Sequence, residues 1–215
     1  NTPPGRGGFF VHTPDADSDR HPLTSEGLFI YDNGFGVDVA PGDRVRVSGT
    51  VAERFDQTAV IDVTAVSVCS SGNSVTVTAL TLPDDAMAGD GLEYHEGMLV
   101  SFPDALYVIE HFYLARYGQV GLAAEGRLDI PTNIAEPGDP AQALTELYEL
   151  LRIILDDGKG AQNVVPVPYL GPDGTLRAGD TVTGLTGVLS FDFGEFRIHP
   201  TEPVTFQRVN QRPAV

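Results

Sequence analysis

The feature that constrains the fold most is a pattern that occurs twice along the chain. An apolar segment ends in aspartate, a Gly-Asp pair follows, and a segment of alternating apolar residues with an internal glycine comes next. The first copy covers residues 27–32 and 41–51, and the second covers residues 152–158 and 178–189. A Gly-Asp pair before alternating residues is typical of a tight turn that enters a β-strand. The sequence therefore predicts two similar β-sheet units in one chain.

The glycines inside the alternating segments predict that each sheet curls on itself. Val45, Val47 and Val51 fall on one face of a strand by two-residue periodicity. Gly49 lies among them and Gly187 lies in the second copy, and a glycine inside a strand usually marks a bulge or a bend. A small barrel needs such bends to close. We therefore expect a mainly β fold of two tandem OB-like Greek-key barrels.

The domain limits follow from the turn signals and from one polar, glycine-bearing segment. We expect the first OB-like barrel over residues 1–82, a linker over 83–91, the second barrel over 92–209 and an exit segment over 210–215. The expected strands lie at residues 8–12, 28–31, 44–53, 58–69, 97–102, 105–111, 119–123, 152–155, 180–191 and 195–199. Residues 75–82 are expected as a further strand or as an extended exit segment. The first barrel lacks an opening strand, since only a proline- and glycine-rich segment precedes its first strand. An unpaired edge is expected at that place.

One stretch of the second half predicts an inserted amphipathic helix near residues 140–151. Asp139 and Pro140 form a cap and first-turn pair. Leu144, Leu147 and Leu151 then recur at three- and four-residue spacing. OB barrels commonly carry a helix that plugs one open end, so we expect these leucines to pack against the barrel core.

The charge of the chain restricts its binding partners. Asp and Glu number 30 against 13 Lys and Arg, which gives a formal net charge of -17. Such a surface repels phosphate backbones over a Debye length of roughly 8–10 Å, so broad nucleic-acid binding is disfavoured. A local basic groove or a bridging divalent cation would still allow DNA to bind. No apolar run approaches the ~20 residues that a membrane helix needs, so no membrane partner is expected.

The cysteine count and the N-terminal sequence bear on the cellular context. Cys69 is the only cysteine, so the chain cannot form an internal disulfide. Cys69 ends an alternating segment, which predicts a buried small side chain rather than a nucleophile. The first residues have neither the basic nor the apolar segment of a signal peptide. We therefore expect the chain to start inside a longer precursor.

An ordered set of short phrases runs along most of the chain. The phrases lie at residues 8–11, 24–31, 41–49, 96–100, 116–118, 127–128, 131–133, 137–138, 155–158, 176–180, 185–189 and 210–214. Each phrase alone has low specificity. The ordered set, from about Gly8 to Ala214, resembles the non-catalytic region of the ExeM-type extracellular bacterial nucleases.

The resemblance implies a secreted protein with OB-like domains ahead of an endonuclease/exonuclease/phosphatase-type catalytic domain. A segment similar to residues 210–214 leads directly into the nuclease domain in that family. Here the chain ends at Val215, and the carboxylates and the histidine–aspartate pair of such a domain do not follow. The resemblance therefore implies a domain type and a secreted context, with no catalytic residues in this chain.

Four acidic residues are the metal-binding candidates. Asp15, Asp17, Asp19 and Glu26 have the spacing of positions 1, 3, 5 and 12 of a calcium-binding loop. Arg20 replaces the glycine of such a loop, which argues against an EF-hand. Two interpretations stay open: a loop that binds calcium, and a solvated hairpin loop without a cofactor.

Three arginines are the nucleic-acid-binding candidates. Arg44 and Arg46 alternate with apolar residues and should face outward, and together with Arg54 they are expected to form one compact basic patch. The alternative is a solvated face paired with acidic neighbours. Aromatic residues at positions 9, 10, 29 and 31 could stack with bases, but core packing is the favoured interpretation.

Two classes of function follow from these observations. The first is a non-catalytic tandem OB-like module of a secreted nuclease-type protein, which positions substrate or packs against a downstream nuclease domain. The second is an extracellular structural or filament-forming protein, in which a neighbouring chain supplies the strand that the first barrel lacks. A carbohydrate-binding or cell-surface module is a third interpretation, based on the versatility of the fold alone.

Overall fold

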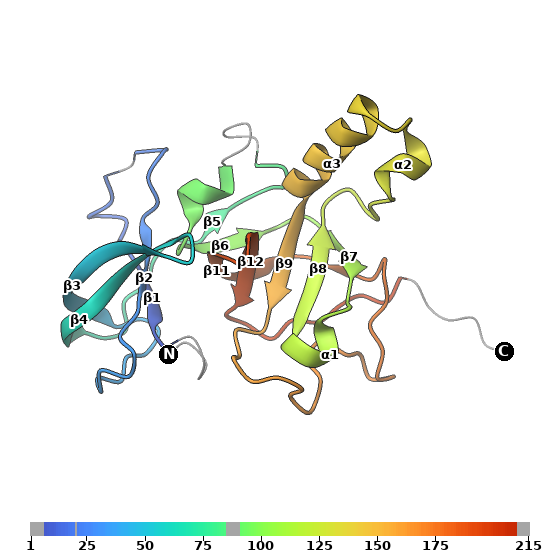
Figure 1. Cartoon of the computed structure of the whole chain (residues 1–215). Helices are drawn as coiled ribbons and strands as arrows, with labels where there is room; N and C mark the ends of the chain where they lie inside the picture. Colours follow the sequence, from blue (N-terminus) through green and yellow to red (C-terminus); the bar gives the residue numbers. More distant parts are fainter. Residues whose placement is uncertain (1–6, 20, 85–90, 210–215) are drawn as a thin grey trace.

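The computed structural model describes residues 7–19, 21–84 and 91–209, and most of its elements are strands of two β-sheets (Figure 1). The protein is therefore mainly β, as the sequence predicted. The first sheet has four strands in the order β1-β2-β4-β3. Their bounds are Phe9–His12 for β1, Gly27–Ile30 for β2, Gln57–Ser70 for β4 and Arg44–Arg54 for β3.

The second sheet has eight strands in the order β10-β7-β8-β9-β12-β11-β6-β5. Its first four members are β10 (Thr181–Val182), β7 (Leu106–Glu110), β8 (Gln119–Ala123) and β9 (Arg152–Asp156). The others are β12 (Glu195–Pro200), β11 (Leu185–Asp192), β6 (Leu99–Phe102) and β5 (Thr78–Ala79). The curled sheet encloses the larger of the two cores.

The two sheets share one strand arrangement, which agrees with the repeat seen in the sequence. β2 runs parallel to β4, and β9 runs parallel to β12. β1 is antiparallel to β2 as β8 is to β9, and β3 is antiparallel to β4 as β11 is to β12. The order β1-β2-β4-β3 thus corresponds to β8-β9-β12-β11. The second sheet continues with β6, whereas no strand of the described residues pairs with the outer edge of β3.

Most predicted strands lie within two residues of the observed ones, because turns and alternation are local signals. Gly49 marks a bulge as expected, since the register of β3 against β4 shifts between Ser48 and Thr50. The strand predicted at 75–82 is reduced to β5, which pairs with β6 of the second sheet. The strand predicted at 180–191 is divided into β10 and β11. The expected exit segment and most of the expected linker lie outside the described residues.

Each sheet has its own hydrophobic core. The smaller core is formed by Phe9, Ile30, Val39, Val60 and Val66. The larger core lies inside the second sheet, where the side chains of Val100, Val108, Val120, Leu122, Leu155, Leu189 and Ile198 are fully buried. Leu80 and Leu82 belong to this larger core, although the expected limit of the first domain was residue 82. The chain therefore enters the second core before the expected linker.

The helices are short, apart from one that extends from the end of the second sheet. The 3-10 helix η1 covers Gly91–His95, α1 covers Leu114–Tyr117, α2 covers Pro131–Ile134 and α3 covers Asp139–Leu151. Figure 1 shows α3 beyond the upper end of β9, with α2 beside it. No helix of the described residues is both long and apolar enough to cross a membrane.

The helix was predicted in the right place, but its predicted packing was wrong. In α3 only Ala141 and Leu151 are buried, whereas Leu147 and Leu150 are 41% and 40% exposed. β9 begins at the residue that follows α3, so the helix continues away from the strand instead of turning back over the barrel end. The leucine stripe therefore does not plug the barrel.

A close backbone contact joins the two sheets, and we call it the junction. It consists of the start of β2 and the turn before β6, where Gly27 lies against Gly97. A Cβ atom on Gly27 would lie 2.1 Å from the carbonyl carbon of Gly97, a distance that no side chain tolerates. Ser25 Oγ donates a hydrogen bond to the carbonyl oxygen of Glu96, and the amide of Leu99 donates to His12 Nδ1. The junction therefore fixes one sheet against the other.

Candidate functional site

The four acidic candidates lie in the loop between β1 and β2, where each has its own protein partner. Asp15 accepts hydrogen bonds from the amide and the hydroxyl of Thr76, which hold its pKa below the usual range. Asp17 pairs with Arg44 at 3.1 Å. Asp19 accepts a hydrogen bond from the amide of His21 at 2.7 Å. These contacts tie the loop to neighbouring segments.

Glu26, the last acidic candidate, accepts hydrogen bonds from residues of the same loop. Glu26 Oε1 accepts hydrogen bonds from the hydroxyl of Ser18 at 2.6 Å and from the amide of Asp19 at 3.0 Å. Within the described part of the chain, no three His, Cys, Asp or Glu side chains are grouped so that they could hold a metal ion. The geometry is that of a hydrogen-bonded hairpin loop, and calcium binding there stays a prediction.

The three arginine candidates lie on β3 but do not form one compact patch. Arg44 and Arg54 are the first and last residues of β3, so up to about 33 Å separates them at about 3.3 Å per residue. Arg44 and Arg46 face outward as expected and are exposed, and Arg44 is neutralised in part by Asp17. The expected patch was wrong because alternation defines the face of a strand and ignores distance along it.

Arg54 instead belongs to an aromatic cluster at the end of the β3–β4 hairpin. Its guanidinium lies 3.9 Å from the ring centre of Tyr31 and 4.6 Å from that of Phe55. Phe55 is 70% exposed and, with Asp56, forms the turn of the hairpin at positive φ. We call Tyr31, Arg54 and Phe55 the stacking platform. Phe55 is the exposed member, and Tyr31 and Arg54 are half-buried; an exposed aromatic ring beside a guanidinium can stack with a planar or ring-shaped ligand.

A second hairpin turn carries another exposed phenylalanine. Phe193 lies between β11 and β12, is 84% exposed and has a φ of 54°. The guanidinium of Arg197 lies 5.5 Å from its ring centre. Neither Phe55 nor Phe193 stood out in the sequence, since a single aromatic residue in a turn gives no periodic signal.

One buried carboxylate links both hairpins at the junction. Glu96 is 5% exposed. It accepts hydrogen bonds from the amide of Thr58 at the start of β4 (3.3 Å) and from the amide of Phe191 near the end of β11 (3.2 Å). The pKa of Glu96 is raised to about 7, chiefly by burial and also by the charges of Glu93 and Glu53, against the lowering effect of the two N–H donors. The two hairpin turns are thus anchored within a few residues of the same side chain.

A network of buried polar residues covers the outer side of β9, β11 and β12. Arg197 and Asp156 form an ion pair of 3.0 Å, and both side chains are almost fully buried. Gln119 donates a second hydrogen bond to Asp156 at 2.9 Å. Asp156 also accepts a hydrogen bond from the amide of Gly158, which is the turn geometry that the Asp-Asp-Gly sequence suggests.

Part of this network has the residue types of a serine-hydrolase triad. Ser190 Oγ lies 2.8 Å from His199 Nε2, and His199 Nδ1 lies 3.8 Å from Asp156 Oδ1. A nucleophilic serine must be reached by its substrate. Ser190 is fully buried, and the ring of Phe10 from the first sheet stacks on His199 at 6.3 Å between ring centres. The network therefore connects strands and sheets rather than exposing a nucleophile.

Sequence reasoning missed this network, although a signal for it exists. Arg197 and His199 alternate with the apolar Phe196 and Ile198 along one strand. A strand with one apolar and one polar face usually exposes the polar face. Here Phe10 of the first sheet packs on His199, and Arg197 is buried against Asp156 of β9, which a single strand cannot reveal.

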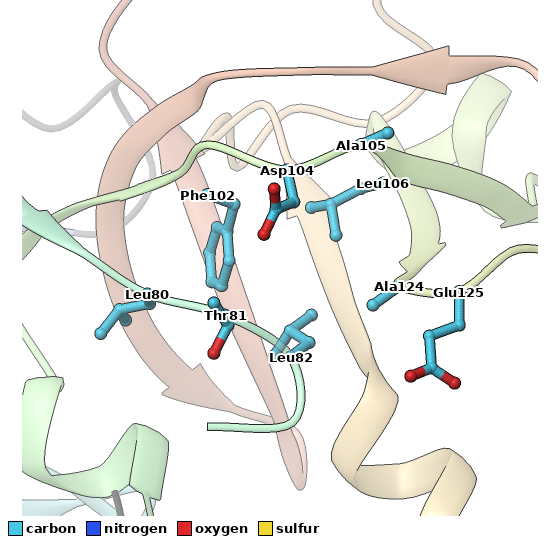
Figure 2. A pocket seen from close by; sticks show the side chains of 9 residues that line it. All are labelled: Leu80, Thr81, Leu82, Phe102, Asp104, Ala105, Leu106, Ala124 and Glu125. Carbon is cyan, nitrogen blue, oxygen red and sulfur yellow. The ribbon is translucent and has the colours of Figure 1, made fainter. Parts of the chain in front are cut away.

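A shallow pocket lies at the end of the second barrel, near the base of α3 (Figure 2). Its volume is about 230 Å³. The lining residues are Leu80, Thr81, Leu82, Phe102, Asp104, Ala105, Leu106, Ala124 and Glu125. Figure 2 shows apolar side chains over most of the lining, with the carboxylates of Asp104 and Glu125 beside them. The polar side chains of the lining are those of Thr81, Asp104 and Glu125.

The exposed side chains also include Cys69, which the sequence predicted to be buried. Cys69 lies near the end of β4, where that strand extends beyond the small core of the first sheet. The prediction was wrong because alternation continues along β4 after the apolar layer that would cover it has ended.

Comparison with known proteins gives a family and no function. No curated protein and no solved structure matches the chain. One family model matches residues 58–210, which are more than half of the chain and cover nearly all of β4 of the first sheet and every strand of the second. The chain therefore belongs to the family described as a domain of unknown function, DUF8508.

Proposed function

We propose that the chain is a non-catalytic module of two OB-like barrels in a secreted nuclease-type protein, and that it positions substrate beside the catalytic domain. The resemblance of its sequence phrases to the ExeM-type nucleases supports this context. The Ser190–His199–Asp156 arrangement, which has the residue types of a hydrolase triad, is buried, so a substrate does not reach its hydroxyl. These observations favour a binding role over a catalytic one.

The observation that carries the proposal is the stacking platform. Tyr31, Arg54 and Phe55 present a guanidinium between two aromatic rings at the end of a hairpin. Stacking of a base on an aromatic side chain contributes about 1–3 kcal/mol and requires no particular base. A platform of this kind suits a segment of single-stranded DNA.

The acidic surface limits how such a strand can bind. A net charge of -17 opposes a long phosphate backbone, so contact must be confined to a few nucleotides. Arg54 supplies a local positive charge, and Arg46 on the same strand forms no ion pair within the described residues. We therefore propose short, weak contact at the platform, strengthened when a catalytic domain holds the rest of the strand.

Exposed apolar residues near α3 suit the packing of a downstream catalytic domain. Ile130 precedes α2, Ile134 is the last residue of α2, and Leu147 lies on α3. Their side chains are 65%, 58% and 41% exposed, respectively. Exposed apolar side chains gathered in one region usually mark a site of protein contact.

The proposal is tested by the binding of a fluorescent 12-residue oligothymidylate, followed by anisotropy at low salt. Phe55→Ala should weaken binding at least fivefold, since it removes one stacking ring. Phe112→Ala is the matched control, because Phe112 is 80% exposed and lies outside the platform. Equal affinities for the two variants, or no binding by the unmodified chain, would refute the platform. Cleavage of DNA by the purified chain with magnesium or calcium would refute the non-catalytic assignment.

A further inference from the structure

We propose that the first sheet is completed by a fifth strand, which pairs antiparallel with the outer edge of β3 and is supplied by the polypeptide N-terminal to β1. The inference rests on the comparison of the two sheets within this chain. It does not depend on nucleic-acid binding.

The strand arrangement of the second sheet has one more strand next to β11 than the first sheet has next to β3. β3 corresponds to β11, because each is antiparallel to the strand that runs parallel to β2 or to β9. β11 has a partner on both sides: β12 on one edge and β6 on the other. β3 pairs with β4 on one edge, and no described strand pairs with the other. The first sheet therefore has an open position where the second has β6.

The apolar side chains of β3 are less buried than those of the corresponding strand β11. Leu185 and Leu189 of β11 are 3% and 0% exposed, because β6 and the curled sheet cover them. Val45 and Val47 of β3 are only partly buried, and Val51 is 68% exposed. The apolar face of β3 thus lacks the cover that β11 has. A strand with apolar residues at alternate positions would supply it.

β6 shows what the missing strand should look like. Val100 and Phe102 are 0% and 1% exposed and point into the core, whereas Leu99 and Ser101 alternate with them and are partly exposed. Four residues suffice to cover the end of β11 that they contact, with Val188 opposite Leu99 and Leu185 opposite Phe102. We expect the same alternation, over four or more residues, in the strand that covers β3.

The source of the strand follows from the chain order. In the second sheet β6 comes before β8, and β8 corresponds to β1. The equivalent strand of the first sheet thus lies on the N-terminal side of β1. A second copy of the chain is the less suitable donor, because two chains of net charge -17 repel each other.

The test grafts a strand onto the N-terminal side of the full chain. A second copy of residues 97–102 is joined ahead of residue 1 by a Gly/Ser linker of about 10 residues, which gives a high effective concentration. In the control graft the copied strand carries Val100→Asp and Phe102→Asp. Hydrogen–deuterium exchange then measures the protection of residues 44–54, and light scattering measures the mass.

The inference expects at least tenfold slower exchange over β3 in the apolar graft than in the control graft, with both proteins monomeric. Equal exchange in the two grafts would overturn the open position on β3. Slower exchange that appears only together with a doubled mass would assign the strand to a second copy, and would overturn the proposed source.

Discussion

The buried carboxylate of Glu96 predicts that the chain loses stability as the pH rises through neutrality. Its pKa changes from 4.5 in the unfolded chain to about 7 in the folded one. The folded state therefore binds the proton more tightly, and the stabilisation is complete below the unfolded pKa and is lost as the pH rises through the folded pKa. At about 1.4 kcal/mol per pKa unit, the loss between pH 4.5 and 8 is on the order of 3 kcal/mol.

The assay compares the unmodified chain with Glu96→Gln, and chemical unfolding is followed by far-UV circular dichroism from pH 5 to pH 8.5. Glutamine keeps one acceptor for the amides of Thr58 and Phe191, so its effect on the free energy of unfolding should be a constant offset. The difference between the two proteins then isolates the titration of Glu96. That difference should move by about 3 kcal/mol in favour of the glutamine variant as the pH rises.

The comparison is needed because other groups titrate in the same range. Burial lowers the pKa of His12 and of His95, and a histidine that is neutral in the folded state gains stability as the pH rises through 6.5. These contributions oppose that of Glu96 in the unmodified chain, and both proteins share them. Parallel stability profiles for the two proteins would refute the assignment of a raised pKa to Glu96.

Three further predictions concern the junction, the buried ion pair and the acidic loop. Gly27→Ala should destabilise the chain by about 3 kcal/mol or more in urea unfolding, because its Cβ would meet the backbone of the turn before β6; a loss under 1 kcal/mol would contradict the contact. Arg197→Ala should lower the free energy of unfolding by about 3–5 kcal/mol, because it leaves the buried carboxylate of Asp156 without its ion pair. Arg44→Ala should lower it by less than about 1 kcal/mol, because the pair with Asp17 is exposed. Similar losses for the two variants would contradict the difference in burial. If the loop binds calcium, millimolar calcium should raise the Tm of the unmodified chain but not that of Asp15→Asn/Asp17→Asn, and equal shifts would remove the hypothesis.

The strands could be predicted from the sequence because their signals are local. The Gly42-Asp43 turn, the alternation of Val45 and Val47 and the bulge at Gly49 all depend on residues close together in the chain. The two curled sheets followed from the same pattern and its repetition. The place of α3 was also a local signal, although its N-cap is Gly138 and Asp139 is the first residue of the helix instead of the expected cap.

The packing of these elements could not be predicted in the same way. The direction of α3 depends on its continuity with β9, which decides whether Leu147 meets the barrel or solvent. Arg54 was separated from Arg44 by the length of β3 and joined to Tyr31, a residue of another segment. Glu96 and Gly97 were only part of a short phrase before a strand, and their role depends on Gly27, which lies about 70 positions earlier.

The backbone contact between Gly27 and Gly97 has a mechanical consequence. Two domains joined only by a flexible connection tumble independently, and a ligand that touches both must first stop that motion. Here the contact between Gly27 and Gly97 takes the place of a flexible hinge. We therefore expect the hairpin turns that carry Phe55 and Phe193 to keep a constant spacing and orientation. If a DNA strand contacts both turns under the proposed function, it binds without the cost of first ordering one sheet against the other.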